Sequence, residues 1–104
     1  MPTPLWEPDA LKIEDANITA FARAMEARWN VRLPDYPGLD EFSITEMEKF
    51  WIGIREFCDV RASEWGERVL TDGGKMPGAA FFGDARLNYA QNLLRRRDDS
   101  AAII

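Results

Sequence analysis

The chain offers one cysteine as a thiol nucleophile and has no histidine at any of its 104 positions. Cys58 is the one cysteine, so an intrachain disulfide is impossible and a reducing compartment is compatible with the composition. A nucleophilic cysteine needs a neighbouring base, and here only lysine or aspartate would be available. Because Cys58 falls on the apolar side of an expected helix, we predict a buried small hydrophobic residue instead of a nucleophile.

Two polar segments invite a ligand-binding interpretation, and neither has the required spacing. The acidic loop 31–42 lacks the glycine-centred carboxylate pattern of a calcium site, so we predict that it is a solvated surface. The Thr-Asp-Gly-Gly turn at 71–74 has no strand before it and no lysine with a hydroxyl residue after it, unlike a phosphate-binding loop. The sequence therefore predicts no catalytic, cofactor-binding or metal-binding residue.

The charge balance argues against nucleic acid and anionic membranes as partners. Thirteen basic and eighteen acidic residues give a net charge of −5, and both kinds of partner select for clustered lysine and arginine. The single basic cluster, Arg95–Arg97, is followed at once by Asp98 and Asp99. The start of the chain lacks a cationic and apolar leader pattern, and no run of about 18 apolar residues occurs. We expect a cytoplasmic protein without a membrane span.

The elements that must position the remaining residues begin with an arm and a helix. Prolines at three of the first eight positions predict an extended arm over 1–16, in which Trp6 anchors to an apolar surface. Apolar residues at helical spacing then predict a helix over 17–29. Asn17 is its expected N-cap, and Asn30 is expected to help end it.

A second helix is expected after the loop, with two alternative starts. Ser43 and Thr45 each stand three residues before a glutamate, so either residue can form a capping box. Gly53 lies inside this helix, where it permits close approach of a neighbouring backbone. The apolar face, which we expect to pack in a core and not to bind a ligand, carries Met47, Phe50, Trp51, Ile54, Phe57 and Cys58.

The C-terminal half is less regular. Residues 61–70 are compatible with a short helix interrupted or ended at Gly66, and turns follow around Phe81 and Phe82. Asn88 then predicts the N-cap of an amphipathic helix that runs to Arg97, where positive charge suits the helix C-terminus.

The final residues favour an incomplete strand. The apolar, partly β-branched run at 101–104 has no turn or polar tail after it, which is unusual for a complete domain. We therefore expect a mostly α-helical N-terminal piece with three or four helices and long irregular loops. It would end in the first strand of a following α/β body.

Taken in order, these segments resemble the N-terminal region of the AMP-forming acyl-CoA ligases of the acetyl-CoA synthetase family, and most closely its acetoacetyl-CoA synthetase branch. The likeness runs from Leu5–Pro8 to the Leu-Asn-Tyr-Ala-Gln-Asn-Leu-Leu stretch at 87–94. Phe42 and Phe81 stand where the family usually has tryptophan, and Gln91 where it has glutamate. The signature residues, expected to have packing roles, are Trp6, Phe50, Trp51, Phe57, Phe81, Phe82, Leu87, Asn88, Tyr89 and Asn92.

The resemblance implies a reaction whose catalytic residues lie further along the family's chain. A carboxylate attacks the α-phosphate of ATP with magnesium present, and coenzyme A then displaces AMP. It also implies an arm (1–16), a helical N-terminal domain (17–97) and the start of the catalytic body (98–104). The implied partner is this downstream body, and the isolated piece is expected to self-associate.

Two other interpretations stay open at this point. Within the enzyme class, the same domain of an acetyl- or propionyl-CoA synthetase fits nearly as well. From another class, a free-standing helical module with an aromatic binding face also fits the pattern.

Overall fold

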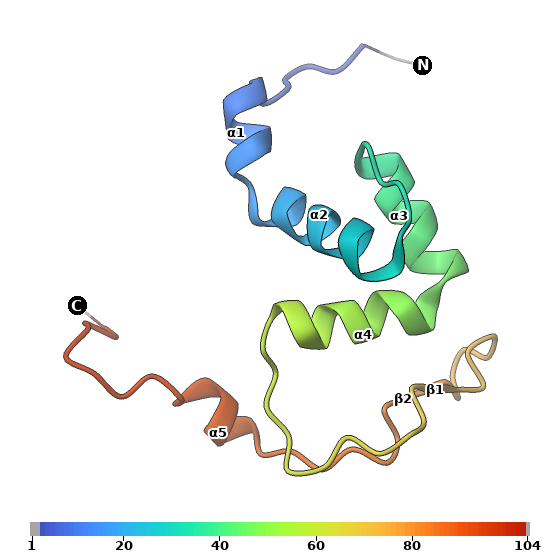
Figure 1. Cartoon of the computed structure of the whole chain (residues 1–104), viewed down its shortest axis with the longest axis vertical. Helices are drawn as coiled ribbons and strands as arrows, with labels where there is room; N and C mark the ends of the chain where they lie inside the picture. Colours follow the sequence, from blue (N-terminus) through green and yellow to red (C-terminus); the bar gives the residue numbers. More distant parts are fainter. Residues whose placement is uncertain (1–2, 104) are drawn as a thin grey trace. The chain divides into compact units, whose positions relative to one another are not determined.

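The computed structural model describes residues 3–103 and divides the chain into two compact units, Met1–Phe57 and Cys58–Ile104. The first unit contains the helices α1 to α4, and the second contains a β-hairpin and the helix α5 (Figure 1). The expectation of a small, mostly helical protein is confirmed. In the part of the chain that the structure describes, no helix is long and apolar enough to cross a bilayer.

The N-terminal segment is only partly extended, because α1 spans Ala10–Asp15 within the expected arm. The carboxylate of Asp9 accepts a hydrogen bond from the backbone N–H of Lys12 at 2.9 Å and caps this helix. A proline restricts its own backbone and that of the residue before it, so the prolines do not prevent the segment after Pro8 from forming a helix. The prediction of an extended segment was therefore wrong for residues 10–15.

The helix α2 spans Asn17–Trp29, as the apolar spacing predicted. Asn30 ends it in the left-handed conformation, with φ 53°, which asparagine tolerates better than most residues. The predicted N-cap was wrong: Ala16 holds that position without a side-chain hydrogen bond, and Asn17 is the first helical residue.

The segment expected to be a loop contains α3, which spans Tyr36–Thr45. Asp35 caps this helix by accepting from the backbone N–H of Gly38 at 2.9 Å. Pro37 lies in the first turn, where its missing N–H costs nothing. The proline that suggested a loop is thus compatible with a helix start.

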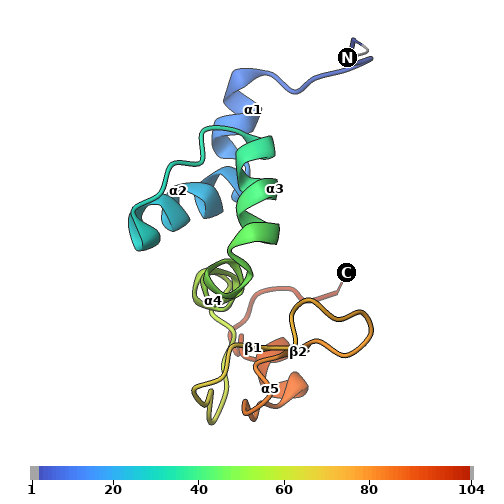
Figure 2. The ribbon, with the colours of Figure 1, turned by 90° about the vertical axis from the view of Figure 1, so that its right-hand side faces the viewer.

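The next helix, α4, spans Met47–Phe57, and Glu46 separates it from α3. Ser43 and Thr45 both belong to α3, where their hydroxyls donate to the carbonyls of Asp40 and Glu41. Neither predicted capping box forms, so both alternative starts were wrong. Figure 2 views α4 nearly end-on, with α3 running in a different direction.

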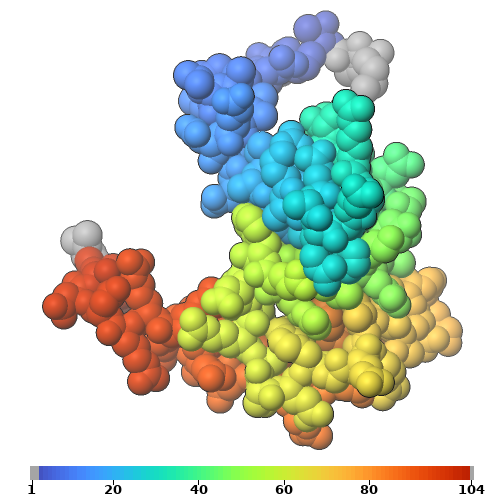
Figure 3. All heavy atoms as spheres, viewed as in Figure 1, coloured from blue at the N-terminus to red at the C-terminus, as the bar shows by residue number. Residues whose placement is uncertain are grey.

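The core of the first unit is formed by residues of α2, α3 and α4, whose heavy atoms are drawn as spheres in Figure 3. The Phe21 ring contacts the Phe50 and Phe57 rings edge-on, with centroids 5.5 and 5.4 Å apart. Gly53 is buried against Met25, so the expected close approach is made by a side chain. The buried residues are Phe21, Ala22, Met25, Leu33, Leu39 and Phe42.

Glu26 ties α2 to the segment that leads into α3. Its carboxylate accepts from the backbone N–H of Leu33 at 2.9 Å and from the Arg23 guanidinium at 2.7 Å. Arg23 also donates to the Leu33 carbonyl at 3.1 Å, which closes a small network. The hydrogen bond from Leu33 and then that from Arg23 hold the pKa of Glu26 below its usual value.

The second unit is built on an antiparallel hairpin, not on the short helix expected over 61–70. The strands β1 (Leu70–Thr71) and β2 (Ala80–Phe81) pair with Leu70 opposite Phe81. Gly66 has φ 72°, a conformation that ends helical geometry and favours glycine. That helix prediction was wrong.

The last helix, α5, spans Tyr89–Leu93 and is shorter than the expected helix to Arg97. Residues 98–103 form no strand, and Ile104, the end of the predicted strand, lies outside the described residues. A strand needs a partner for its backbone groups, and the described chain offers none there. The strand prediction, made for residues 101–104, was therefore wrong for residues 101–103.

Cys58 follows the end of α4 and is exposed, so the prediction of a buried cysteine was wrong. The apolar periodicity of α4 continued one residue further than the helix does. Once the chain leaves the helix, that periodicity no longer places a side chain.

Candidate functional site

The helix α5 is attached to the start of its unit through Asn92. The Asn92 side-chain oxygen accepts from the backbone N–H of Arg61 at 2.6 Å, and its amide donates to the Arg61 carbonyl at 2.8 Å. The same amide group donates to the carbonyl of Asn88 at 3.0 Å. Asn88 in turn caps the helix by accepting from the Gln91 N–H at 3.1 Å, as predicted. Asn92 therefore uses both ends of its amide to join two distant segments.

Arg95 makes a second attachment just beyond the helix. Its guanidinium donates to the carbonyls of Cys58, at 3.1 Å, and Asp59. It also lies 3.5 Å from the Asp59 carboxylate. Capping of backbone carbonyls by a cation fixes the turn at Asp59, where φ is 52°. Asn92 and Arg95 thus hold α5 against residues 58–61 through hydrogen bonds and an ion pair.

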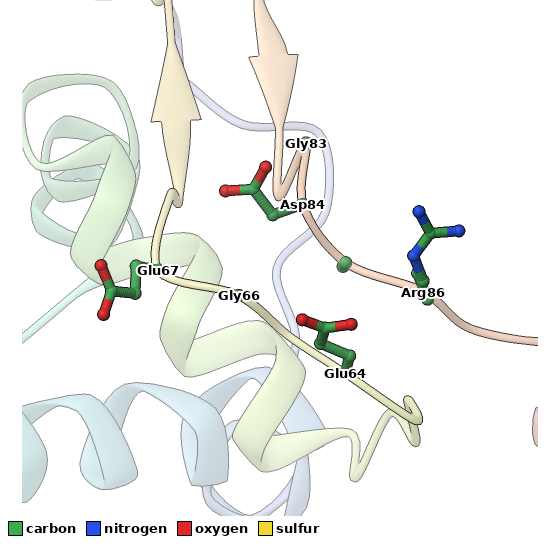
Figure 4. Close-up of a pocket in the computed structure, with 7 residues that line it drawn as sticks. Glu64, Gly66, Glu67, Gly83, Asp84 and Arg86 are labelled. Carbon is green, nitrogen blue, oxygen red and sulfur yellow. The ribbon is translucent and has the colours of Figure 1, made fainter.

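The hairpin carries a polar hollow of about 540 Å³, shown in Figure 4. Arg68 donates two hydrogen bonds to the Asp84 carboxylate, at 2.9 and 2.7 Å. This contact lowers the pKa of Asp84 and raises the pKa of Arg68. The hollow is lined by Glu64, Gly66, Glu67, Gly83, Asp84, Ala85 and Arg86.

The hollow does not have the geometry of a reactive site. Asp84 is already paired, and the carboxylates of Glu64, Glu67 and Asp84 do not point to a common centre (Figure 4). Among residues 3–103, no group of three histidine, cysteine or acidic side chains is arranged to hold a metal ion. The hydrogen bonds here stabilise the hairpin, which is a structural role.

The first unit carries an apolar groove of about 540 Å³ between α1, α2 and α3. The polar side chains at its edge are already hydrogen-bonded: Arg23 donates to Glu26 and to the Leu33 carbonyl, and Asp35 caps α3. The sequence did not predict this groove, because α1 and α3, which form two of its walls, were expected to be irregular. Its apolar lining includes Ile13, Ala16, Ile18, Ala22, Leu33 and Leu39.

The structure places the signature residues in three surroundings. Phe50 and Phe57 contact Phe21 in the first unit, while Trp6 is 72% exposed. Phe82 contacts the Trp65 ring in the second unit, with centroids 5.4 Å apart. The exposed members are Trp6, Trp51, Phe57, Phe81, Leu87, Asn88 and Tyr89.

The role of Asn88 was predictable from the sequence, whereas the roles of three other residues that hold the second unit together were not. Arg61, Arg68 and Arg95 bond to groups 31, 16 and up to 37 positions away in the chain. No local sequence pattern predicts partners that are so distant in the chain. The single signal was the asparagine pair at 88 and 92, four positions apart on one side of a helix.

Comparison with known proteins gives a consistent likeness over nearly the whole chain. The chain is 38% identical over 101 residues, 97% of its length, to the acetoacetyl-coenzyme A synthetase of Rhizobium meliloti (strain 1021). It is 30% identical over 91% of its length to the acetoacetyl-CoA synthetase of Rattus norvegicus. It is also 33% identical over 86% of its length to a malonamoyl-CoA synthetase of Penicillium aethiopicum.

The chain spans only a small part of these relatives, namely 15%, 14% and 12% of their respective lengths. No family model matches the chain, and no solved structure matches it. The chain is therefore homologous to a segment of the acetoacetyl-CoA synthetases, and this segment makes up about one seventh of their length.

Proposed function

We propose that this chain is the N-terminal, non-catalytic domain of an AMP-forming acetoacetate–CoA ligase. The observation that carries the proposal is the similarity to acetoacetyl-CoA synthetases over 97% of the chain and 15% of the relative. The whole protein would convert acetoacetate, ATP and coenzyme A into acetoacetyl-CoA, AMP and pyrophosphate. ATP, magnesium and coenzyme A would bind in the remainder of that protein.

The proposed role of this domain is structural. Residues 17–97 would form the N-terminal domain, and residues 98–104 would lead into the catalytic body. Each polar network described above ends on backbone groups or on a partner side chain within its own unit. Such networks stabilise local geometry and leave the chemistry to the body. The proposed location of the enzyme is the cytoplasm.

The proposed substrate class is short acids with a second carbonyl group at the β position. The names of two kinds of relative support it, because acetoacetyl and malonamoyl groups both carry a carbonyl there. A series of acids tests this class: the full-length gene product is incubated with ATP, magnesium, coenzyme A and one acid at a time. We expect AMP release to be fastest with acetoacetate and weaker with acetate and propionate. Preference for acetate or propionate would reassign the chain to the corresponding synthetase.

A free-standing interaction module remains the second candidate, favoured by one observation. Large apolar side chains such as Trp6, Leu11 and Tyr89 are each more than 70% exposed, as on a protein-binding surface. The reading frame beyond codon 104 separates the candidates. A stop codon there supports the module, whereas a long continuing frame that encodes a Gly-rich phosphate loop supports the ligase.

A further inference from the structure

The helix α5 is held with its polar side toward its own unit. Asn92 lies within α5, and Arg95 lies two positions beyond its last residue, Leu93. Both side chains bond to the segment 58–61, as described above. A helix on the surface of a globular unit usually turns its apolar side inward and its polar side to water. The arrangement of α5 is the reverse.

The apolar side chains of this helix face solvent. Tyr89 and Leu93, four positions apart, form one ridge and are 78% and 65% exposed. Leu94 at the C-cap is 62% exposed, and Leu87 just before the helix is 52% exposed. We call Leu87, Tyr89, Leu93 and Leu94 the α5 face. Four large apolar residues gathered on such a short segment indicate a surface that another protein segment covers.

We propose that the α5 face docks onto the catalytic body of the same polypeptide, the part that follows residue 104. This inference rests on the proposed function. The acetoacetyl-CoA synthetases extend far beyond the segment that this chain matches, since 15% and 14% of their lengths are covered. Under the proposed function, a body of that size belongs to the same polypeptide as α5.

A second copy of the chain fits this face less well than the attached body. A five-residue helix is only about 7.5 Å long, whereas a stable interface between separate proteins buries about 800 Å² on each partner. A tethered partner needs far less contact area, because a short linker gives an effective concentration of about 1 mM. The small size of the face therefore favours an intramolecular partner.

The chemistry of the face also defines the matching surface. Its four side chains are uncharged, and two of the nearby guanidinium groups are engaged with their own segment: Arg95 with residues 58–59, and Arg96 with Asp98 at 3.2 Å. The surface of the body that receives α5 is accordingly apolar and not acidic. An apolar contact would also shield the hydrogen bonds of Asn92 from water.

Hydroxyl-radical footprinting of the full-length protein tests the docking. Leu5 and Leu11 in the first unit, 105% and 73% exposed, are internal references. We expect Leu93 and Leu94 to be labelled about tenfold more slowly than Leu11, because labelling would require local opening. Labelling at the same rate would overturn the proposal. Protection that appears only as protein concentration rises would also overturn it, since the partner would then be a second copy.

A matched pair of variants gives an independent readout in the full-length protein. Leu93→Glu should accelerate proteolysis within residues 95–103, whereas Leu11→Glu, on a leucine of the first unit that is also mostly exposed, should not. Equal effects of the two substitutions would contradict the docking. Neither experiment requires activity, so the two proposals can fail separately. Protection of α5 in a protein that does not convert acetoacetate would refute only the proposed substrate. Activity with acetoacetate in a protein whose α5 is unprotected would refute only the docking.

Discussion

At the scale of single residues, the contact between Gly53 and Met25 determines how closely α2 and α4 pack. Met25 is 2% exposed, and a Cβ at position 53 would overlap its sulfur and terminal methyl group. The sequence predicted that Gly53 allows close approach, because glycine inside a helix needs a compensating reason. It did not predict the partner, because Met25 lies 28 positions away on another helix.

Gly53→Ala should therefore destabilise the protein although alanine is the better helix former. Overpacking costs about 1–3 kcal/mol, and with an overlap as severe as that with the Met25 sulfur we expect this cost to outweigh the helix-propensity gain of about 1 kcal/mol. Urea unfolding followed by circular dichroism measures the difference. Gly74→Ala is the control, since nothing lies within 4 Å of a Cβ there. In a Met25→Ala background the cost of Gly53→Ala should disappear, and its persistence would show that another contact is responsible.

Asn92 is the second residue whose role is specific enough to test. Asn92→Ala removes two hydrogen bonds to the backbone of Arg61, each worth about 1 kcal/mol. We expect faster amide exchange at Arg61 and Gln91, measured by hydrogen–deuterium exchange. Gln91→Ala, one position away and exposed, should leave the exchange at Arg61 unchanged. If both variants behave alike, Asn92 is not the attachment point of α5.

At the scale of elements, helix prediction succeeded where apolar spacing and turn residues agreed. The periodic stripe and Asn30 defined α2, and Asn88 defined the start of α5. Prediction failed for α1 and α3, whose caps, Asp9 and Asp35, stand beside prolines that suggested loops. Both helices are short. α3 buries Leu39 and Phe42 in the core, which no local pattern shows, whereas α1 buries no residue and starts at its cap, Asp9.

The link between α2 and α3 should depend on pH through Glu26. Its pKa is lowered in the folded state, so its contribution to stability is complete above the unfolded pKa, near 4.5. That contribution is lost as the pH falls through the lower, folded pKa. We expect Glu26→Gln to have a smaller loss of stability than the wild type between about pH 5 and pH 3.

Thermal unfolding at several pH values measures this dependence. Glu48→Gln, on an exposed glutamate of α4, is the control for the loss of one negative charge. Arg68 lowers the pKa of Asp84, so the stability of the second unit should also fall as the pH decreases. Both variants retain Asp84 and Arg68, so this contribution is the same in the two. An unchanged pH dependence in Glu26→Gln would show that its bonds to Leu33 and Arg23 do not stabilise the fold.

At the scale of the whole molecule, the family likeness was predictable while the candidate surface was not. The order of aromatic and Leu-Asn-Tyr motifs pointed to the ligases, and the relatives agree. The reversed orientation of α5 depends on Asn92 and Arg95 reaching residues 58–61, contacts that arise only in the folded second unit. The apolar residues of α5 alone predicted an ordinary amphipathic helix.

The central claim is that the chain is a structural part of a larger ligase and does no chemistry itself. The most direct measurement is AMP formation from ATP with acetoacetate, magnesium and coenzyme A, assayed in parallel for the full-length protein and for residues 1–104. We predict one AMP for each acetoacetyl-CoA formed by the full-length protein, and none formed by residues 1–104. Turnover by residues 1–104, or no AMP from the full-length protein with any short carboxylic acid, would contradict the claim.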